Sequence, residues 1–129
     1  MKKVLLDTSI LIDFLRRKSK SDSLFVKLLQ QKYQLNISIV THTELFSGKT
    51  IWENEKLHLE IETLCSGLHM LPLETEISKK AGKIRAQNNT TIIDAIIAAT
   101  AINHGLSLVT LNLKDFEDIE GLRLFDNIN

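Results

Sequence analysis

The chain has 129 residues, enough for one domain that buries its own hydrophobic core. Its 43% hydrophobic and 25% charged residues exclude a disordered chain, and the zero net charge removes the simplest argument for a nucleic-acid partner, a strongly basic composition. Cys65 stands alone, which excludes an intramolecular disulfide and a multi-cysteine metal site. We expect a cytoplasmic protein without membrane contact, because neither a signal peptide nor an apolar run of about 20 residues is visible.

In the first half of the chain the predicted strands alternate with helices. Residues 3–6 form a short apolar strand, and apolar residues at helical spacing predict helices over 9–17 and 22–32. Alternating β-branched residues predict a strand over 35–40. Thr41 then opens a helix through residue 47 that Gly48 ends, and an amphipathic helix follows over 53–66.

The second half continues this alternation. A brief strand over 69–73 leads to a helix over 74–87, and a second helix over 91–104 is closed by Gly105. Short strands are predicted over 106–109 and 122–124. Strands separated by helices, without hairpin turn signals, indicate βαβ units and a mostly parallel sheet of the α/β class, in a single domain over 1–129.

Asp94 is the acidic residue that local structure explains least. It is the only formally charged residue between Thr91 and His104, in a helix that is apolar nearly all round. A buried carboxylate without a partner costs several kcal/mol, so it needs a cation, donors or water. The competing interpretation is a capping box, with Thr91 as the N-cap and Asp94 three residues later.

Three further acids follow predicted strands. Asp7 comes directly after the first strand, Glu44 follows the second, and Asp115 lies just beyond the strand over 106–109. Each also has a local interpretation as a turn or cap residue, including a capping box of Thr41 with Glu44 and a cap formed by Asn112 with Asp115. Parallel strands bring their carboxyl ends to one edge, where clustered carboxylates repel one another unless a cation offsets them.

These motifs, taken together, resemble the PIN-domain ribonucleases, in particular the VapC-type toxins of toxin–antitoxin pairs. The matching segments, in family order, are Leu5 to Ile12 (LLDTSILI), Thr43 to Leu45 (TEL), Asp94 to Ala101 (DAIIAATA), and Leu108 to Asn112 (LVTLN) with Asp115-Phe116. The resemblance implies a three-layer α/β/α sandwich and an Mg²⁺- or Mn²⁺-dependent endoribonuclease that uses metal-activated water. It also implies a cognate antitoxin protein as a partner.

The resemblance maps the catalytic and metal-binding acids onto Asp7, Glu44, Asp94 and Asp115. Some relatives carry the fourth acid at the position of Asn112 instead. Thr8, Ser9 and Asn112 are the implied substrate-binding residues beside these acids, and Thr110 is a supporting hydroxyl. The chain departs from the family pattern at Leu111, where a basic residue is common.

Positive charge for an RNA substrate is concentrated in two basic clusters. One runs from Arg16 to Lys20, and the other from Lys79 to Arg85. Both are typical of solvated helix faces, but Arg85 is nearest in sequence to Asp94 and is the first candidate for a phosphate contact. The apolar helices around Trp52 and the neutral charge suggest a homodimer or an inhibitor-bound form.

Two other functions compete with the nuclease. A non-catalytic interaction module of the same fold would use its acids only as helix caps. A phosphoacceptor domain would use Asp7 and would need a lysine near the chain's end, for which Lys114 is the candidate.

Overall fold

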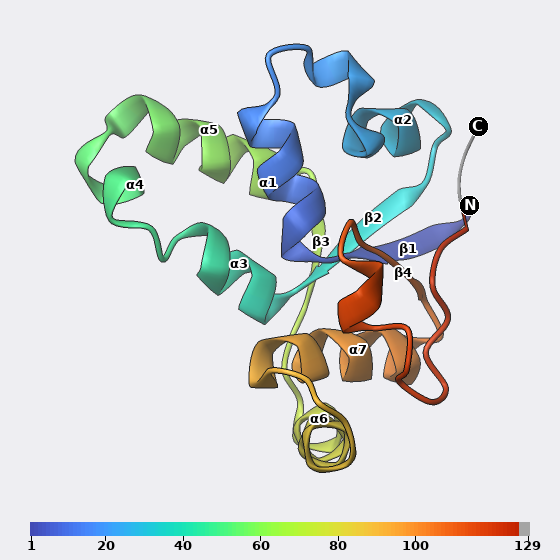
Figure 1. Ribbon diagram of the computed structural model, residues 1–129. Coiled ribbons are helices and arrows are strands. Elements are labelled where there is room, and N and C mark those ends of the chain that lie inside the picture. The colour runs from blue at the N-terminus through green and yellow to red at the C-terminus, as the bar shows by residue number, and fades with distance from the viewer. Residues whose placement is uncertain (127–129) are drawn as a thin grey trace.

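A computed structural model describes residues 1–126 and contains one parallel sheet (Figure 1). Its strands are β1 (Lys3–Leu6), β2 (Gln34–Ser38), β3 (His69–Leu71) and β4 (Ser107–Val109), in the order β3-β2-β1-β4. Every neighbouring pair is parallel, with Leu6 opposite Ile37 in β2 and Val109 in β4. The carboxyl ends of the strands therefore share one edge, and the predicted α/β fold with a parallel sheet is confirmed.

Within residues 1–126, seven α-helices surround the sheet. They are α1 (Thr8–Arg16), α2 (Leu24–Gln30), α3 (Ile39–Leu45), α4 (Lys49–Glu53), α5 (Glu55–Ser66), α6 (Thr75–Gln87) and α7 (Ile92–His104). The described part of the chain also contains two single turns of 3₁₀-helix, η1 (Lys20–Asp22) and η2 (Leu113–Asp115). Helix α7 ends as predicted at Gly105, whose φ of 63° is the left-handed conformation that glycine adopts without strain.

The sheet separates two hydrophobic cores, because successive side chains of a strand point to opposite faces. Val4 and Leu6 pack in the core beneath α1, α2 and α5, while Leu5 packs on the other face against α6 and α7. Figure 1 shows these helices on either side of the strands. The predicted three-layer α/β/α sandwich is thus confirmed.

Several predicted boundaries are wrong. Helix α3 begins at Ile39 with Ser38 as its N-cap, so Thr41 and Glu44 do not form a capping box. The helix predicted over 22–32 is η1 followed by α2, and Ser23 caps α2. Asn54 divides the helix predicted over 53–66, and the strand predicted over 122–124 is a single bridge from Leu124 to Leu108.

Within residues 1–126, no helix combines the length and the apolar composition that crossing a membrane requires.

Candidate functional site

Asp7 lies at the carboxyl end of β1 and caps the start of α1. Its Oδ1 accepts hydrogen bonds from the Ser9 amide (3.0 Å) and the Ser9 hydroxyl, and its Oδ2 accepts one from the Thr110 hydroxyl at 2.6 Å. The residue is only 4% exposed. Burial raises the pKa of the Asp7 carboxyl, while the hydrogen bonds from Ser9 and Thr110 act in the opposite direction. A carboxylate oxygen has two lone pairs, so an oxygen that accepts one hydrogen bond can also bind a cation.

The segment after β4 is fastened to Asp7 and α1. The Leu111 amide donates to the Ser9 hydroxyl at 3.1 Å, and the Asn112 amide donates to the Thr110 hydroxyl at 2.9 Å. Ser9 therefore holds both Asp7 and this segment. Asn112 precedes η2, but no hydrogen bond of its side chain caps that turn within residues 1–126.

Glu44 reaches the same edge from α3, in the last turn of that helix rather than at its start. Its Oε1 accepts a 2.5 Å hydrogen bond from the Thr8 hydroxyl, and the Thr8 and Thr41 hydroxyl oxygens lie 3.2 Å apart, so that Thr8 can accept a hydrogen bond from Thr41. Thr41 is fully buried, whereas Glu44 is exposed. The first residue of α1 thus fixes the direction of the Glu44 carboxylate.

Asp94 is both part of a helix cap and part of the site. The Thr91 hydroxyl accepts a 3.1 Å hydrogen bond from the Asp94 amide, so Thr91 caps the helix through the backbone of Asp94, and the same hydroxyl also acts on the Asp94 carboxyl. Burial raises the pKa of this carboxyl, as do the charges of Asp115, Asp7 and Glu44; the Thr91 hydroxyl lowers it. The charges of these acids therefore act on one another at one place.

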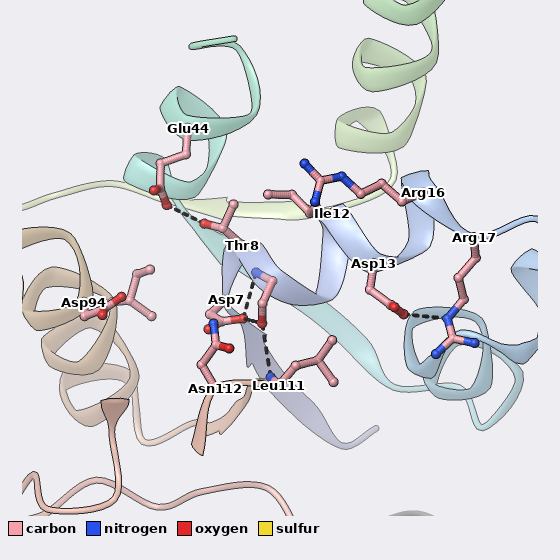
Figure 2. A pocket seen from close by; sticks show the side chains of 12 residues that line it. Asp7, Thr8, Ile12, Asp13, Arg16, Arg17, Glu44, Asp94, Leu111 and Asn112 are labelled. Atoms are coloured by element: carbon pink, nitrogen blue, oxygen red, sulfur yellow. Dashed lines mark hydrogen bonds and ion pairs between the residues drawn. The ribbon is translucent and has the colours of Figure 1, made fainter. Parts of the chain in front are cut away.

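A cleft of about 520 Å³ brings most of the predicted residues together. Asp7, Glu44 and Asp94 line it along with Thr8, Ser9 and Asn112. In Figure 2 the carboxylates of Glu44 and Asp94 face the same open space as Asp7. Within residues 1–126, no three His, Cys, Asp or Glu side chains are close enough to hold an ion by themselves.

Asp115 and Arg85 lie on the far side of Asp94. They line a second hollow of about 520 Å³ together with Asn89, Thr90 and Thr91, and Asp94 borders both hollows. Asp115 is exposed in η2 and acts on Asp94 through its charge.

Beyond Thr8 and Ser9, the sequence interpretation did not place α1 in the cleft, although it named Arg16 and Arg17 in a basic cluster. Ile12, Asp13, Arg16 and Arg17 line the cleft beside Thr8 and Ser9 (Figure 2). The signal was present, since Ile12 and Arg16 follow Thr8 at intervals of four residues and share its face of the helix. Asp13 accepts a 2.9 Å hydrogen bond from Arg17 Nε.

Lys20 has a different role from the arginines before it in sequence. Its Nζ donates to the carbonyl oxygens of Phe14 (2.9 Å) and Leu15 (3.0 Å). It therefore satisfies carbonyl groups at the end of α1 and does not line the cleft.

Comparisons with known proteins show the family to which the chain belongs. The model of the PIN domain family matches residues 4–122. The chain is 34% identical to ribonuclease VapC1 of Rickettsia felis, covering 94% of this chain and 93% of the relative. It is 31% identical to the tRNA(fMet)-specific endonuclease VapC of Salmonella typhimurium, covering 98% of both.

Among solved structures, the chain is similar to DNA-bound VapBC from Salmonella typhimurium, with a TM-score of 0.83 and 28% identity over 98% of both chains. It is also similar to a toxin–antitoxin complex from Klebsiella pneumoniae, with a TM-score of 0.73 and 28% identity, covering 97% of this chain and 99% of that one.

Proposed function

Because the chain belongs to the PIN domain family and is a VapC-type ribonuclease of a toxin–antitoxin module, we propose that it hydrolyses RNA internally with a divalent cation held between Asp7 and Asp94. The observation that carries this proposal is the convergence of acids from separate segments. The charges of Asp115, Asp7 and Glu44 raise the pKa of the Asp94 carboxyl. These three acids come from separate segments, namely η2, the end of β1 and α3. Such repulsion is costly unless a cation offsets it.

The donor set suits Mg²⁺ or Mn²⁺. Carboxylate oxygens are the ligands that hard divalent cations prefer, and Mg²⁺ keeps several water ligands and needs only one or two carboxylates. That requirement agrees with acids that share a cleft yet do not form a closed three-ligand cluster within residues 1–126. Asp7 and Asp94 would hold the ion, and Glu44 and Asp115 would hold its water ligands or a second ion.

The residues around the acids then have defined tasks in the proposed hydrolysis. A bound cation lowers the pKa of a water and offsets the charge that builds on the phosphodiester. Ser9 and Thr110 fix the orientation of Asp7, and Thr8 fixes that of Glu44. Asn112 borders the cleft where a substrate phosphate or sugar would pass.

The competing functions fit the geometry less well. A non-catalytic module would use its acids only as caps, yet the α7 cap rests on the Thr91 hydroxyl and the Asp94 amide, and Asp94 lines the cleft with Asp7 and Glu44. A phosphoacceptor domain that uses Asp7 would need a lysine near the chain's end beside that carboxylate. Lys114 is exposed and lines neither hollow beside Asp94.

For partners, we propose a cognate antitoxin protein and a homodimer. The antitoxin is supported by the related structures, which are toxin–antitoxin complexes. The homodimer is supported by Trp52, which is 65% exposed although its Nε1 is held by the Phe46 carbonyl at 2.7 Å. Light scattering of the purified chain, alone and with the antitoxin, tests both proposals.

The proposed activity is tested by incubating total RNA with the protein, with and without Mg²⁺. Wild-type protein should cleave only with the cation, and Asp94→Asn should lower the rate at least a hundredfold, because it removes a ligand charge but keeps the cap. Asp118→Asn, at an exposed acid outside both hollows, is the matched control. Full Mg²⁺-dependent cleavage by Asp94→Asn would contradict the assignment.

A further inference from the structure

Two arginines lie on opposite sides of the acidic residues. Arg16 lines the cleft that contains Asp7 and Glu44, and Arg85 lines the hollow on the other side of Asp94. Since Asp94 borders both hollows, they lie next to each other on the two sides of this residue, with Arg16 in the lining of one and Arg85 in the lining of the other.

Arg16 is available to bind a ligand. It is exposed at the end of α1 and forms no ion pair with any residue of 1–126, whereas its neighbour Arg17 is paired with Asp13. In Figure 2 its side chain extends along α1 toward the end of the helix that carries Thr8. Its guanidinium is thus directed back toward the acids.

Arg85 is available on the other side. It lies in the last turn of α6, is exposed, and has no ion-pair partner in the described part of the chain, even though Asp115 borders the same hollow. The lining of the hollow also includes the polar residues Asn89, Thr90 and Thr91 and the apolar residue Ile92. The Thr90 hydroxyl is the only buried side-chain polar atom without a hydrogen-bond partner among residues 1–126.

We propose, on the basis of the function proposed above, that Arg16 and Arg85 bind the RNA phosphates on opposite sides of the phosphodiester that is cleaved. The acids at the centre repel a polyanion, and the chain's zero net charge supplies no general attraction, so affinity must come from local cations. A guanidinium matches phosphate with paired hydrogen bonds. The enzyme therefore requires a phosphate on each side of the bond that it cuts, and it cuts terminal bonds poorly.

The test uses a short oligoribonucleotide with one cleavage site, in which a neutral methylphosphonate replaces one flanking phosphate at a time. For wild-type protein with Mg²⁺, replacement on either side should lower kcat/KM about tenfold or more, the worth of a charged hydrogen bond. Arg16→Ala should show the same loss and become insensitive to replacement on one side only. Arg85→Ala should become insensitive to replacement of the phosphate on the other side only. Without its arginine, that phosphate makes no contact that the methylphosphonate could remove.

Lys18→Ala and Lys83→Ala are the matched controls. Lys18 follows Arg16 closely and Lys83 shares α6 with Arg85, both are exposed, and neither lines a hollow. These variants should keep the wild-type sensitivity on both sides. The inference is overturned if Arg16→Ala and Arg85→Ala stay sensitive on both sides, or if both lose sensitivity on the same side.

Failure of the proposed function gives a different result. Wild-type protein that cleaves none of these oligonucleotides with Mg²⁺ or Mn²⁺ would contradict the nuclease mechanism. Fluorescence anisotropy of the same oligonucleotides and variants would then still test whether Arg16 and Arg85 bind the flanking phosphates. The inference is supported if the affinity of each arginine variant no longer depends on the phosphate of one side. It is overturned if both arginine variants bind as the wild type does.

Discussion

The Thr110 hydroxyl donates a 2.6 Å hydrogen bond to Oδ2 of Asp7, joining residues 103 positions apart. The contact exists because β4 pairs with β1 in parallel, with Leu6 opposite Val109, so the residues that follow the two strands meet at one edge. Thr110 accepts the Asn112 amide through the same hydroxyl. A single side chain therefore orients the proposed metal ligand and the loop beside it.

Thr110→Val should weaken both stability and metal binding. The variant keeps the shape but removes the donor to Asp7 and the acceptor for Asn112, which should lower the free energy of unfolding by about 1–3 kcal/mol. Urea denaturation and Mn²⁺ titration measure the two effects. Thr100→Val is the control, since its hydroxyl bonds only the Ile96 carbonyl at 2.7 Å within α7. An unchanged Mn²⁺ affinity in Thr110→Val would contradict the proposed role of Thr110.

Asp94→Asn should stabilise the metal-free protein at neutral pH. The substitution removes a partly buried charge that Asp115, Asp7 and Glu44 repel, while the Thr91 cap on the backbone is kept. We expect the Tm to rise by about 2–4 °C and the Mg²⁺-dependent shift in Tm to disappear. Differential scanning fluorimetry measures both, with Asp118→Asn as the control, and a lower Tm in Asp94→Asn would argue against repulsion at this site.

Metal affinity should increase with pH. Burial raises the pKa values of Asp7 and Asp94 above those of the unfolded chain. Their contribution to the free energy of unfolding is therefore fully present below the unfolded value of about 3.9 and is lost as pH rises through the folded pKa values. A cation competes with these protons, so Mg²⁺ should bind more tightly as pH rises from about 4 toward 7. Calorimetric titrations across this range that give one constant affinity would refute the assignment of Asp7 and Asp94 as the ligands.

Glu44→Gln should separate activity from stability. Glu44 is exposed and its side chain accepts a hydrogen bond from Thr8, so the free energy of unfolding should change by less than about 0.5 kcal/mol. The RNA cleavage rate should fall about tenfold or more, because the variant lacks one of the charges around the cation. Glu53→Gln, an exposed acid in α4, is the control. Comparable rates for the two variants would remove Glu44 from the site.

Lys20→Ala should lower stability without changing RNA binding, in contrast to Glu44→Gln. The ammonium group satisfies two carbonyl oxygens at the end of α1, so its loss should lower the free energy of unfolding by about 1 kcal/mol and leave the Michaelis constant for RNA unchanged. Chemical denaturation and steady-state kinetics test this together. A raised Michaelis constant with unaltered stability would instead assign Lys20 to substrate binding.

Much of the fold and the candidate site was predictable because local patterns are strong there. The apolar run before Asp7 fixed β1, and the nearly uncharged segment around Asp94 fixed α7 and its Thr91 cap. The start of α3 was not predictable in the same way, because Ile39 and Val40 continue a β-branched pattern and only the Ser38 cap turns them into a helix. The contact of Asp7 with Thr110 depends on strand order and register, which local patterns do not encode.

The central claim is that Asp7 and Asp94 hold one cation between them, and Mn²⁺ binding to a double-mutant cycle tests it most directly. Affinity and stoichiometry would be measured by calorimetry for wild type, Asp7→Asn, Asp94→Asn and the double variant. Shared coordination predicts that each single variant loses most of the affinity and that the double variant loses little more. Losses that add independently, or wild-type affinity in either single variant, would contradict a shared site.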